Sequence, residues 1–254
     1  MLKLFADYHT HTRHSHGRGT VPENIEAARR RGLQEVAITD HGPGMLPWMA
    51  VKSPETLLAI KEEVKAYNRL HPGITALAGV EANVIGVDGE LDVPVKVLSK
   101  LDLVLAGLHL MVVPSSVGDG LRLLGNNLWG SRISPRLARR ARLDNTKALV
   151  EAVYRYHIDI ITHPGLQLSI DTGELARACA RRDTALEINC SHGYLSAGFV
   201  RVAAGEGVSF AINSDAHRPE DVGRLEAGLS LAEKVGLEPE LVINAEYHGK
   251  GCRR

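Results

Sequence analysis

Most strand-like segments of this sequence end in a residue that can bind a metal ion. His9 and His11 are two residues apart at the end of the first segment, so on a strand their imidazoles point to the same side and can bind one ion. Asp215 and His217 repeat this spacing near the other end of the chain. The other candidates end the segments between them or lie in the loop after the first: His16, His41, Glu81, His109 and His163.

These nine side chains predict a cluster of divalent ions. At about three protein ligands per open catalytic ion, they would hold about three ions, and we expect one carboxylate to bridge two of them. Imidazole and carboxylate ligands without a thiolate suit Zn, Mn or Fe. They argue against Cu(I), an iron-sulfur cluster or an all-oxygen Ca site.

Some of these histidines also have a structural interpretation. A single histidine at a strand end, such as His41 or His109, is often only a hydrogen-bonded residue, and Glu81 could pair with a basic neighbour. His14 is the alternative to His16 as the loop ligand, because the two lie two residues apart. We expect the histidines outside the strand ends to be surface or packing residues: His71, His157 and His248.

Short β-rich apolar runs alternate with helix-like segments along the chain, which is typical of a parallel sheet. We expect strands over residues 4–9, 35–40, 75–82, 103–109, 158–163, 185–189 and 208–214. Seven such strands form either a closed barrel or an open doubly wound sheet, but no GxGxxG or P-loop sequence supplies the usual reason for an open sheet. We therefore expect an α/β barrel, whose strand ends share one rim.

The predicted helices cover residues 22–31, 54–68, 145–156, 172–182 and 219–235. No linker or internal repeat marks a boundary, so residues 1–254 are expected to form one domain. Glycines, prolines and six arginines interrupt the pattern between residues 112 and 142. We expect this stretch to be a loop excursion over the rim that helps to select substrate.

Composition narrows the function. Thirty Lys and Arg balance thirty Asp and Glu, so no overall basic charge favours nucleic acid or an anionic membrane. Cys179, Cys190 and Cys252 are few and lack CxxC spacing, which argues against a disulfide framework or a thiolate zinc site. No segment reads as a signal peptide or a membrane span, and we expect a cytoplasmic protein.

The motifs occur in a specific order: His-Thr-His followed by His16, then Ile-Thr-Asp-His-Gly, Gly-Val-Glu-Ala-Asn, His109, Thr-His-Pro-Gly, Glu-Ile-Asn and Ser-Asp-Ala-His. This order resembles the PHP family, the polymerase and histidinol phosphatase metallohydrolases, and most of all its stand-alone bacterial phosphatases. The resemblance implies a distorted (βα)7 barrel with a metal cluster at the C-terminal rim. It also implies three ligand sets: His9, His11, Glu81 and Asp215; then Glu81, His109 and His163; then His16, His41 and His217.

Such a cluster suits hydrolysis of phosphate esters. We expect a phosphomonoesterase in which a metal-bridging hydroxide attacks phosphorus in line, acting on a small phosphorylated substrate. Asp215 and His217 could also move a proton, while Arg18 and His192 are candidate substrate-binding residues. The alternatives are a phosphodiesterase or nuclease, an amidohydrolase-like enzyme, and a metal-binding protein without catalytic activity.

Overall fold

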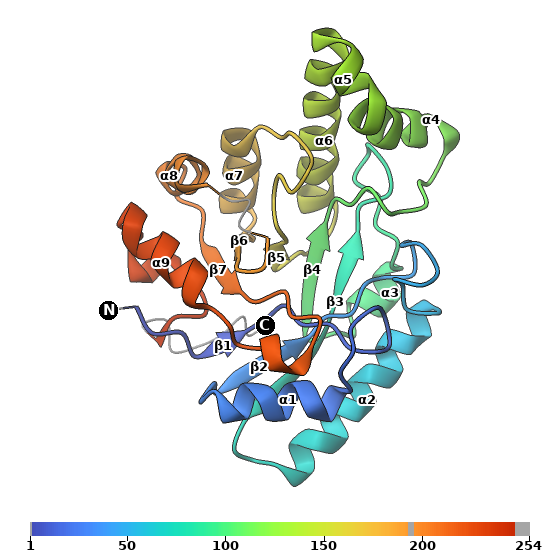
Figure 1. The fold of residues 1–254 in the computed structure, drawn as a ribbon. Helices are drawn as coiled ribbons and strands as arrows, with labels where there is room; N and C mark the ends of the chain where they lie inside the picture. The colour runs from blue at the N-terminus through green and yellow to red at the C-terminus, as the bar shows by residue number, and fades with distance from the viewer. Residues whose placement is uncertain (1, 193–195, 247–254) are drawn as a thin grey trace.

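The computed structural model describes residues 2–192 and 196–246, so His248 and Cys252 lie outside the described residues. Seven parallel strands form one sheet in chain order (Figure 1). They are β1 (Ala6–Asp7), β2 (Glu35–Ile38), β3 (Thr75–Asn83), β4 (Leu103–Gly107), β5 (Ile160–Ile161), β6 (Ala185–Asn189) and β7 (Phe210–Asn213). Each lies within or close to a predicted segment, and the predicted (βα)7 barrel is confirmed.

The barrel closes between β7 and β1 through irregular contacts. At the carboxyl ends of the strands, Thr10 and Ala216 form a parallel bridge, and the amide of His11 donates to the carbonyl of Ala216 over 2.8 Å. Further down, the Asn244 side chain donates to the carbonyls of both Ala6 and Ile212, at 2.9 and 2.7 Å. The first and last strand ends are thereby brought to the same part of the rim.

Successive side chains along each strand point alternately into the barrel and toward the helices, so the strands contribute to two apolar clusters. In β4, Leu103 and Leu105 belong to the cluster inside the barrel, whereas Val104 packs in the larger cluster under the helices. Toward the carboxyl ends, the inward positions become polar, as at the buried Glu81 and Glu187. The barrel interior is therefore an apolar core below and a polar site above.

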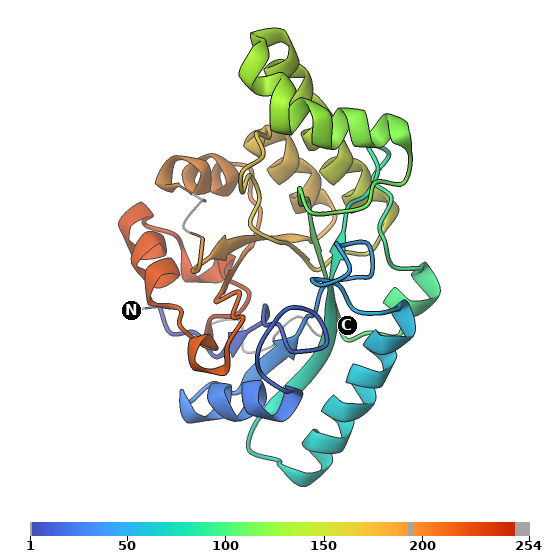
Figure 2. The same ribbon diagram turned by 45° about the vertical axis from the view of Figure 1, so that its right-hand side comes forward.

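The helices surround the sheet (Figure 2). They are α1 (Val21–Arg30), α2 (Pro54–Leu70), α3 (Val95–Leu98), α6 (Pro135–Arg155), α7 (Thr172–Arg181), α8 (Ala197–Gly205) and α9 (Glu226–Val235), with short 3-10 turns η2 (Pro219–Asp221) and η3 (Pro239–Leu241). The sequence starts α1 with a capping box, in which Thr20 and Glu23 satisfy each other's backbone amides.

The expected loop excursion over residues 112–142 is wrong in one respect, because most of it is helical. It contains α4 (Val117–Asp119), the π-helix η1 (Gly120–Gly130), α5 (Ser131–Ile133) and the start of α6, which together stand out from the barrel in Figure 1. Leu123 is buried there, and the side-chain amides of Asn127 and Asn145 donate to each other over 2.8 and 2.9 Å. These contacts dock the segment on α6, a helix predicted ten residues too short at its N-terminal end.

Two other helix predictions differ from the structure. The expected helix over residues 219–235 is divided into η2 and α9 because Gly223, with a φ of 74°, takes a left-handed conformation between them. Two helices, α3 between β3 and β4 and α8 between β6 and β7, have no counterpart among the predicted helices. In the described part of the chain, every helix is too short or too polar to cross a membrane.

Candidate metal centre

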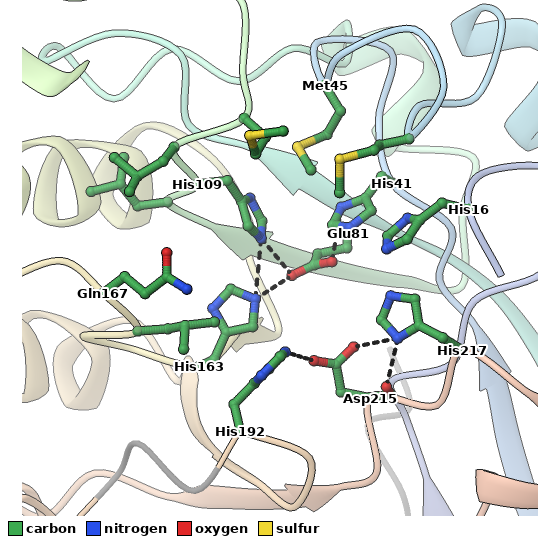
Figure 3. Close-up of a pocket in the computed structure, with 15 residues that line it drawn as sticks. His16, His41, Met45, Glu81, His109, His163, Gln167, His192, Asp215 and His217 are labelled. Atoms are coloured by element: carbon green, nitrogen blue, oxygen red, sulfur yellow. Dashed lines mark hydrogen bonds and ion pairs between the residues drawn. The ribbon is translucent and has the colours of Figure 1, made fainter. Parts of the chain in front are cut away.

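A pocket with a volume of about 230 Å³ opens at the carboxyl ends of the strands (Figure 3). Its lining consists mainly of histidines, acidic residues, methionines and leucines. These residues are His16, His41, Met45, Met49, Glu81, Leu108, His109, Leu110, Met111, His163, Leu166, Gln167, His192, Asp215 and His217. Seven of the nine predicted ligands are among them, and His9 and His11 are buried beneath.

The first group of side chains comprises His9, His11, Glu81 and Asp215. His9 Nε2 lies 3.0 Å from His11 Nε2, 3.2 Å from Glu81 Oε2 and 3.5 Å from Asp215 Oδ1. His11 Nε2 lies 3.5 and 3.2 Å from the same two oxygens. Four ligands at the usual zinc distances are about 3.3 Å apart in a tetrahedron, so this spacing fits one ion.

The second group shares Glu81 with the first. His163 Nε2 lies 2.9 Å from Glu81 Oε1 and 3.1 Å from His109 Nε2, which is itself 3.3 Å from the same oxygen. Oε2 of Glu81 faces the first group and Oε1 the second, as the dashed lines around this residue in Figure 3 show for the second group. Glu81 therefore has the position of a bridging carboxylate.

Histidine rings stack together in the third group. The ring centroid of His16 is 5.0 Å from that of His41 and 4.2 Å from that of His217. His11 lies between this group and the first, 4.6 Å from His41 and 4.4 Å from His217. His14 instead points away from the pocket, with its Nε2 3.0 Å from Glu63 on α2. The geometry thus favours His16 over His14 as the loop ligand.

Several buried polar atoms in these groups lack hydrogen-bond partners in the described structure. Among the described residues, no hydrogen-bond partner exists for His11 Nδ1, His16 Nδ1, His41 Nδ1, His109 Nδ1 or Glu81 Oε2. His41 Nδ1 lies only 2.9 Å from Glu81 Oε2, yet the angles are not those of a hydrogen bond. Buried polar atoms normally have partners, and a cation bound by the lone pairs of both His41 Nδ1 and Glu81 Oε2 would explain the exception at this pair.

Glu187, in the middle of β6, accepts hydrogen bonds from two candidate ligands. Its Oε1 accepts from His9 Nδ1 over 2.7 Å, and its Oε2 accepts from the backbone amide of His163 over 2.8 Å. His163 has a φ of 27°, an unfavourable value for a residue with a side chain. The Glu187 carboxylate therefore fixes the ring of one histidine and the strained backbone of another.

Asp40 fixes the loop that carries His16. Its carboxylate accepts from the backbone amides of Thr12 and Ser15 and from both of their hydroxyl groups. The aspartate of the Thr-Asp-His motif thus supports the loop after β1, while the following His41 faces the pocket.

Burial and the local charges lower the pKa of some pocket histidines and raise the pKa of others. Burial, reinforced by His217 and His41, lowers the pKa of His16 to about 4, and burial lowers the pKa of His109 to about 4. Burial also opposes protonation of His9, but Glu187, Asp215 and Glu81 together raise its pKa well above the usual value. His16 and His109 are therefore neutral at pH 7 and ready to bind a cation, whereas metal binding by His9 would release a proton.

The remaining predicted residues fall into two sets. His192 lies in the pocket with its Nε2 3.2 Å from Asp215 Oδ2, whereas Arg18 is exposed and is absent from the pocket lining. The excursion's arginines are also absent from it, and three of them are paired elsewhere: Arg122 and Arg140 with Asp144, and Arg142 with Asp171. The expected arginine contacts to substrate therefore have no support.

Glu187 was expected only as part of the Glu-Ile-Asn motif and without a role, and the pocket methionines and Gln167 were not expected. Glu187 could have been found, because it occupies the inward register of β6 as Glu81 does in β3. The methionines lie in irregular segments where apolar residues show no periodicity. His71 and His157, expected to be background residues, are absent from the pocket, and His71 stacks on Tyr67 at the end of α2.

The structure is a parallel (βα)7 barrel with histidines and carboxylates gathered at its C-terminal rim, the face on which enzymes with barrel folds have their active sites. The PHP domain profile matches residues 7–190, and the chain belongs to the PHP family. A probable phosphatase of Caldanaerobacter subterraneus subsp. tengcongensis is 34% identical over 253 residues, 96% of this chain and 88% of the relative. The probable phosphatase YcdX of Escherichia coli O139:H28 is 31% identical over 251 residues, 94% of this chain and 89% of the relative.

A solved structure is similar over almost the whole barrel. The histidinol phosphate phosphatase of Lactococcus lactis subsp. lactis Il1403, in complex with zinc, L-histidinol and phosphate, superposes with a TM-score of 0.62. The match covers 92% of this chain and 94% of the other at 15% identity, which shows a shared fold. The family profile and the sequence relatives place this chain among the hydrolases of the PHP phosphatase family.

We expect the protein to purify with about two to three divalent ions per chain, because three groups of ligands converge in one pocket. Elemental analysis after purification without chelators measures this number. A content that stays at or below about one ion after reconstitution with Zn, Mn and Fe would contradict three groups of ligands.

Proposed function

We propose that this protein is a phosphomonoesterase acting on small phosphorylated alcohols. The observation that carries the proposal is Glu81, whose two oxygens face two separate groups of histidines. Adjacent divalent ions, when bound, activate water and neutralise the charge of a phosphoryl group. Phosphate ester hydrolysis needs both effects at the same place, and the names of the relatives agree with it.

The chain's own residues position the reaction. In the first group, Asp215 Oδ1 faces the histidines, while Oδ2 accepts from Asn189 Nδ2 over 3.0 Å and contacts His192. His192 is thereby held beside the candidate ligands and can bind a phosphoryl oxygen or the ester oxygen. His217 lines the pocket with Nδ1 2.9 Å from the Asp215 carbonyl. We assign metal binding to Asp215 and His217, and proton transfer as their second role.

A panel of esters tests the proposal on the metal-reconstituted protein. We expect release of phosphate from monoesters, L-histidinol phosphate included, with kcat/KM at least about a hundredfold above that for bis(p-nitrophenyl) phosphate, p-nitroacetanilide or single-stranded DNA. Chelation should abolish the activity, and Zn or Mn should restore it. Faster cleavage of a diester or an amide than of every monoester would favour the alternative reactions, and no hydrolysis at all would favour a binding protein.

A further inference from the structure

One wall of the pocket is apolar and rich in sulfur. Three of the chain's four methionines, Met45, Met49 and Met111, line it together with three leucines. In Figure 3 the sulfur atoms gather on the side of His41 and His109, and Asp215 and His192 lie across the pocket from them. The candidate metal ligands thus face a surface of a different chemical kind.

The wall is held in place by the chain's own pairing. Met45 is only 3% exposed and forms an antiparallel bridge with Val112, so the loop after β2 pairs with the segment after β4. The amide of Leu46 donates to the carbonyl of Met111 over 2.9 Å, and the amide of Val113 donates to the carbonyl of Gly44 over 2.8 Å. This fixed pairing places methionines from two separate segments beside the same pocket.

The described part of the pocket also lacks lysine and arginine side chains. Its described lining contains neither lysine nor arginine, and Arg122 and Arg142 of the excursion are paired with Asp144 and Asp171. Metal ions would neutralise the phosphoryl group, but a second anionic group that lies against the methionine wall would have no lysine or arginine beside it. Burial of an unpaired charge is unfavourable, so such substrates are disfavoured.

We propose that this methionine wall selects the alcohol part of the substrate, and that the preferred substrates are phosphomonoesters of apolar or aromatic alcohols without a second anionic group. The inference rests on the proposed phosphomonoesterase function. Methionine side chains are unbranched and polarisable, and they contact aromatic rings favourably in several orientations. Gln167, which lines the same pocket, can donate to a polar edge of such a ring.

Kinetics on four alkyl monoesters of similar leaving-group reactivity tests this selection on the metal-reconstituted full chain. The substrates are benzyl phosphate, butyl phosphate, glycerol 3-phosphate and 2-phosphoglycolate. We expect kcat/KM for benzyl phosphate to exceed that for glycerol 3-phosphate by about tenfold, from the apolar area buried against the wall. The ratio to 2-phosphoglycolate should be about a hundredfold, because its carboxylate lacks a partner.

Variants of the two more accessible methionines show whether the wall is responsible. The Met49→Gln/Met111→Gln double variant keeps the side-chain length and should lower the benzyl to glycerol ratio about tenfold. Met111→Lys, at a position 43% exposed, should raise the relative use of 2-phosphoglycolate about tenfold or more. Leu70→Gln, at an exposed leucine that ends α2, is the matched control and should leave both ratios unchanged.

Binding of non-hydrolysable analogues separates this inference from the proposed function. Calorimetry with benzylphosphonate and phosphonoacetate should show about a tenfold or greater preference for benzylphosphonate, which the double variant loses. If no monoester is hydrolysed, the phosphomonoesterase proposal fails, but the binding preference still decides whether the wall selects apolar groups. Equal affinities for the two phosphonates would overturn the inference. So would kcat/KM ratios between the substrates that stay unchanged in both the double variant and Met111→Lys.

Discussion

Replacing Glu81 by glutamine is expected to lower kcat/KM for phosphomonoesters by at least about a thousandfold and to lower the metal content of the protein. The two oxygens of this carboxylate face different groups of histidines, and an amide has only one oxygen and no charge to share between them. Burial opposes ionisation of Glu81, but His41, His9 and His109 hold its pKa well below the usual value, so the native group is a carboxylate. Kinetics and elemental analysis of the same preparation measure both effects.

The fold should survive this substitution, because apolar clusters inside the barrel and under the helices carry most of its stability. Circular dichroism and thermal unfolding check this point. His9→Ala should be inactive for the same reason as Glu81→Gln. His71→Ala, which removes a stacking contact with Tyr67 and a hydrogen bond to the Tyr67 carbonyl, should retain activity within about twofold. If His71→Ala loses as much activity as His9→Ala while both are folded, the separation of ligands from background histidines is wrong.

The barrel and the gathering of ligands at its rim could be predicted from the sequence, because both depend on local patterns: strand-like runs that alternate with helix-like segments, and polar residues that end the strands. The run from Leu103 to Gly107 places its side chains alternately inside and outside, and His109 follows at the same end. Because the parallel strands lie in the sheet in chain order, their carboxyl ends meet at one rim. Which histidine shares an ion with which was implied only by the family resemblance, since spacing along the chain does not give distances across a barrel.

Features that depend on contacts across the fold were harder to predict. The excursion reads as a loop because of Gly118, Gly120, Gly125 and Gly130, yet it is helical where Leu123 is buried and the helices dock on one another. The methionine wall depends on a pairing between residues 44–46 and 111–113, which no local pattern indicates. In both cases tertiary packing overrides local propensity.

Glu187→Gln is expected to weaken metal binding at the first group and to lower kcat by about ten to a hundredfold, although Glu187 is not itself a candidate ligand. The carboxylate receives four donors: His9 Nδ1 and Asn213 Nδ2 reach Oε1, and the His163 amide and Asn189 Nδ2 reach Oε2. A carboxylate is acceptor-only and suits four donors, whereas a glutamine would direct its own N–H groups at two of them. The His9 ring or the His163 backbone must then shift.

Zinc affinity distinguishes a positioning role of Glu187 from a purely structural one, which would leave this affinity unchanged. Competition with a zinc indicator should show weaker binding of one ion in Glu187→Gln, with the fall in kcat exceeding any change in KM. Glu35→Gln is the matched control, because Glu35 is also a buried carboxylate of the barrel but accepts from the Tyr8 hydroxyl, 2.7 Å away, and contacts no candidate ligand in the described structure. If both variants lose stability equally and keep native metal affinity, Glu187 stabilises the barrel without positioning its ligands.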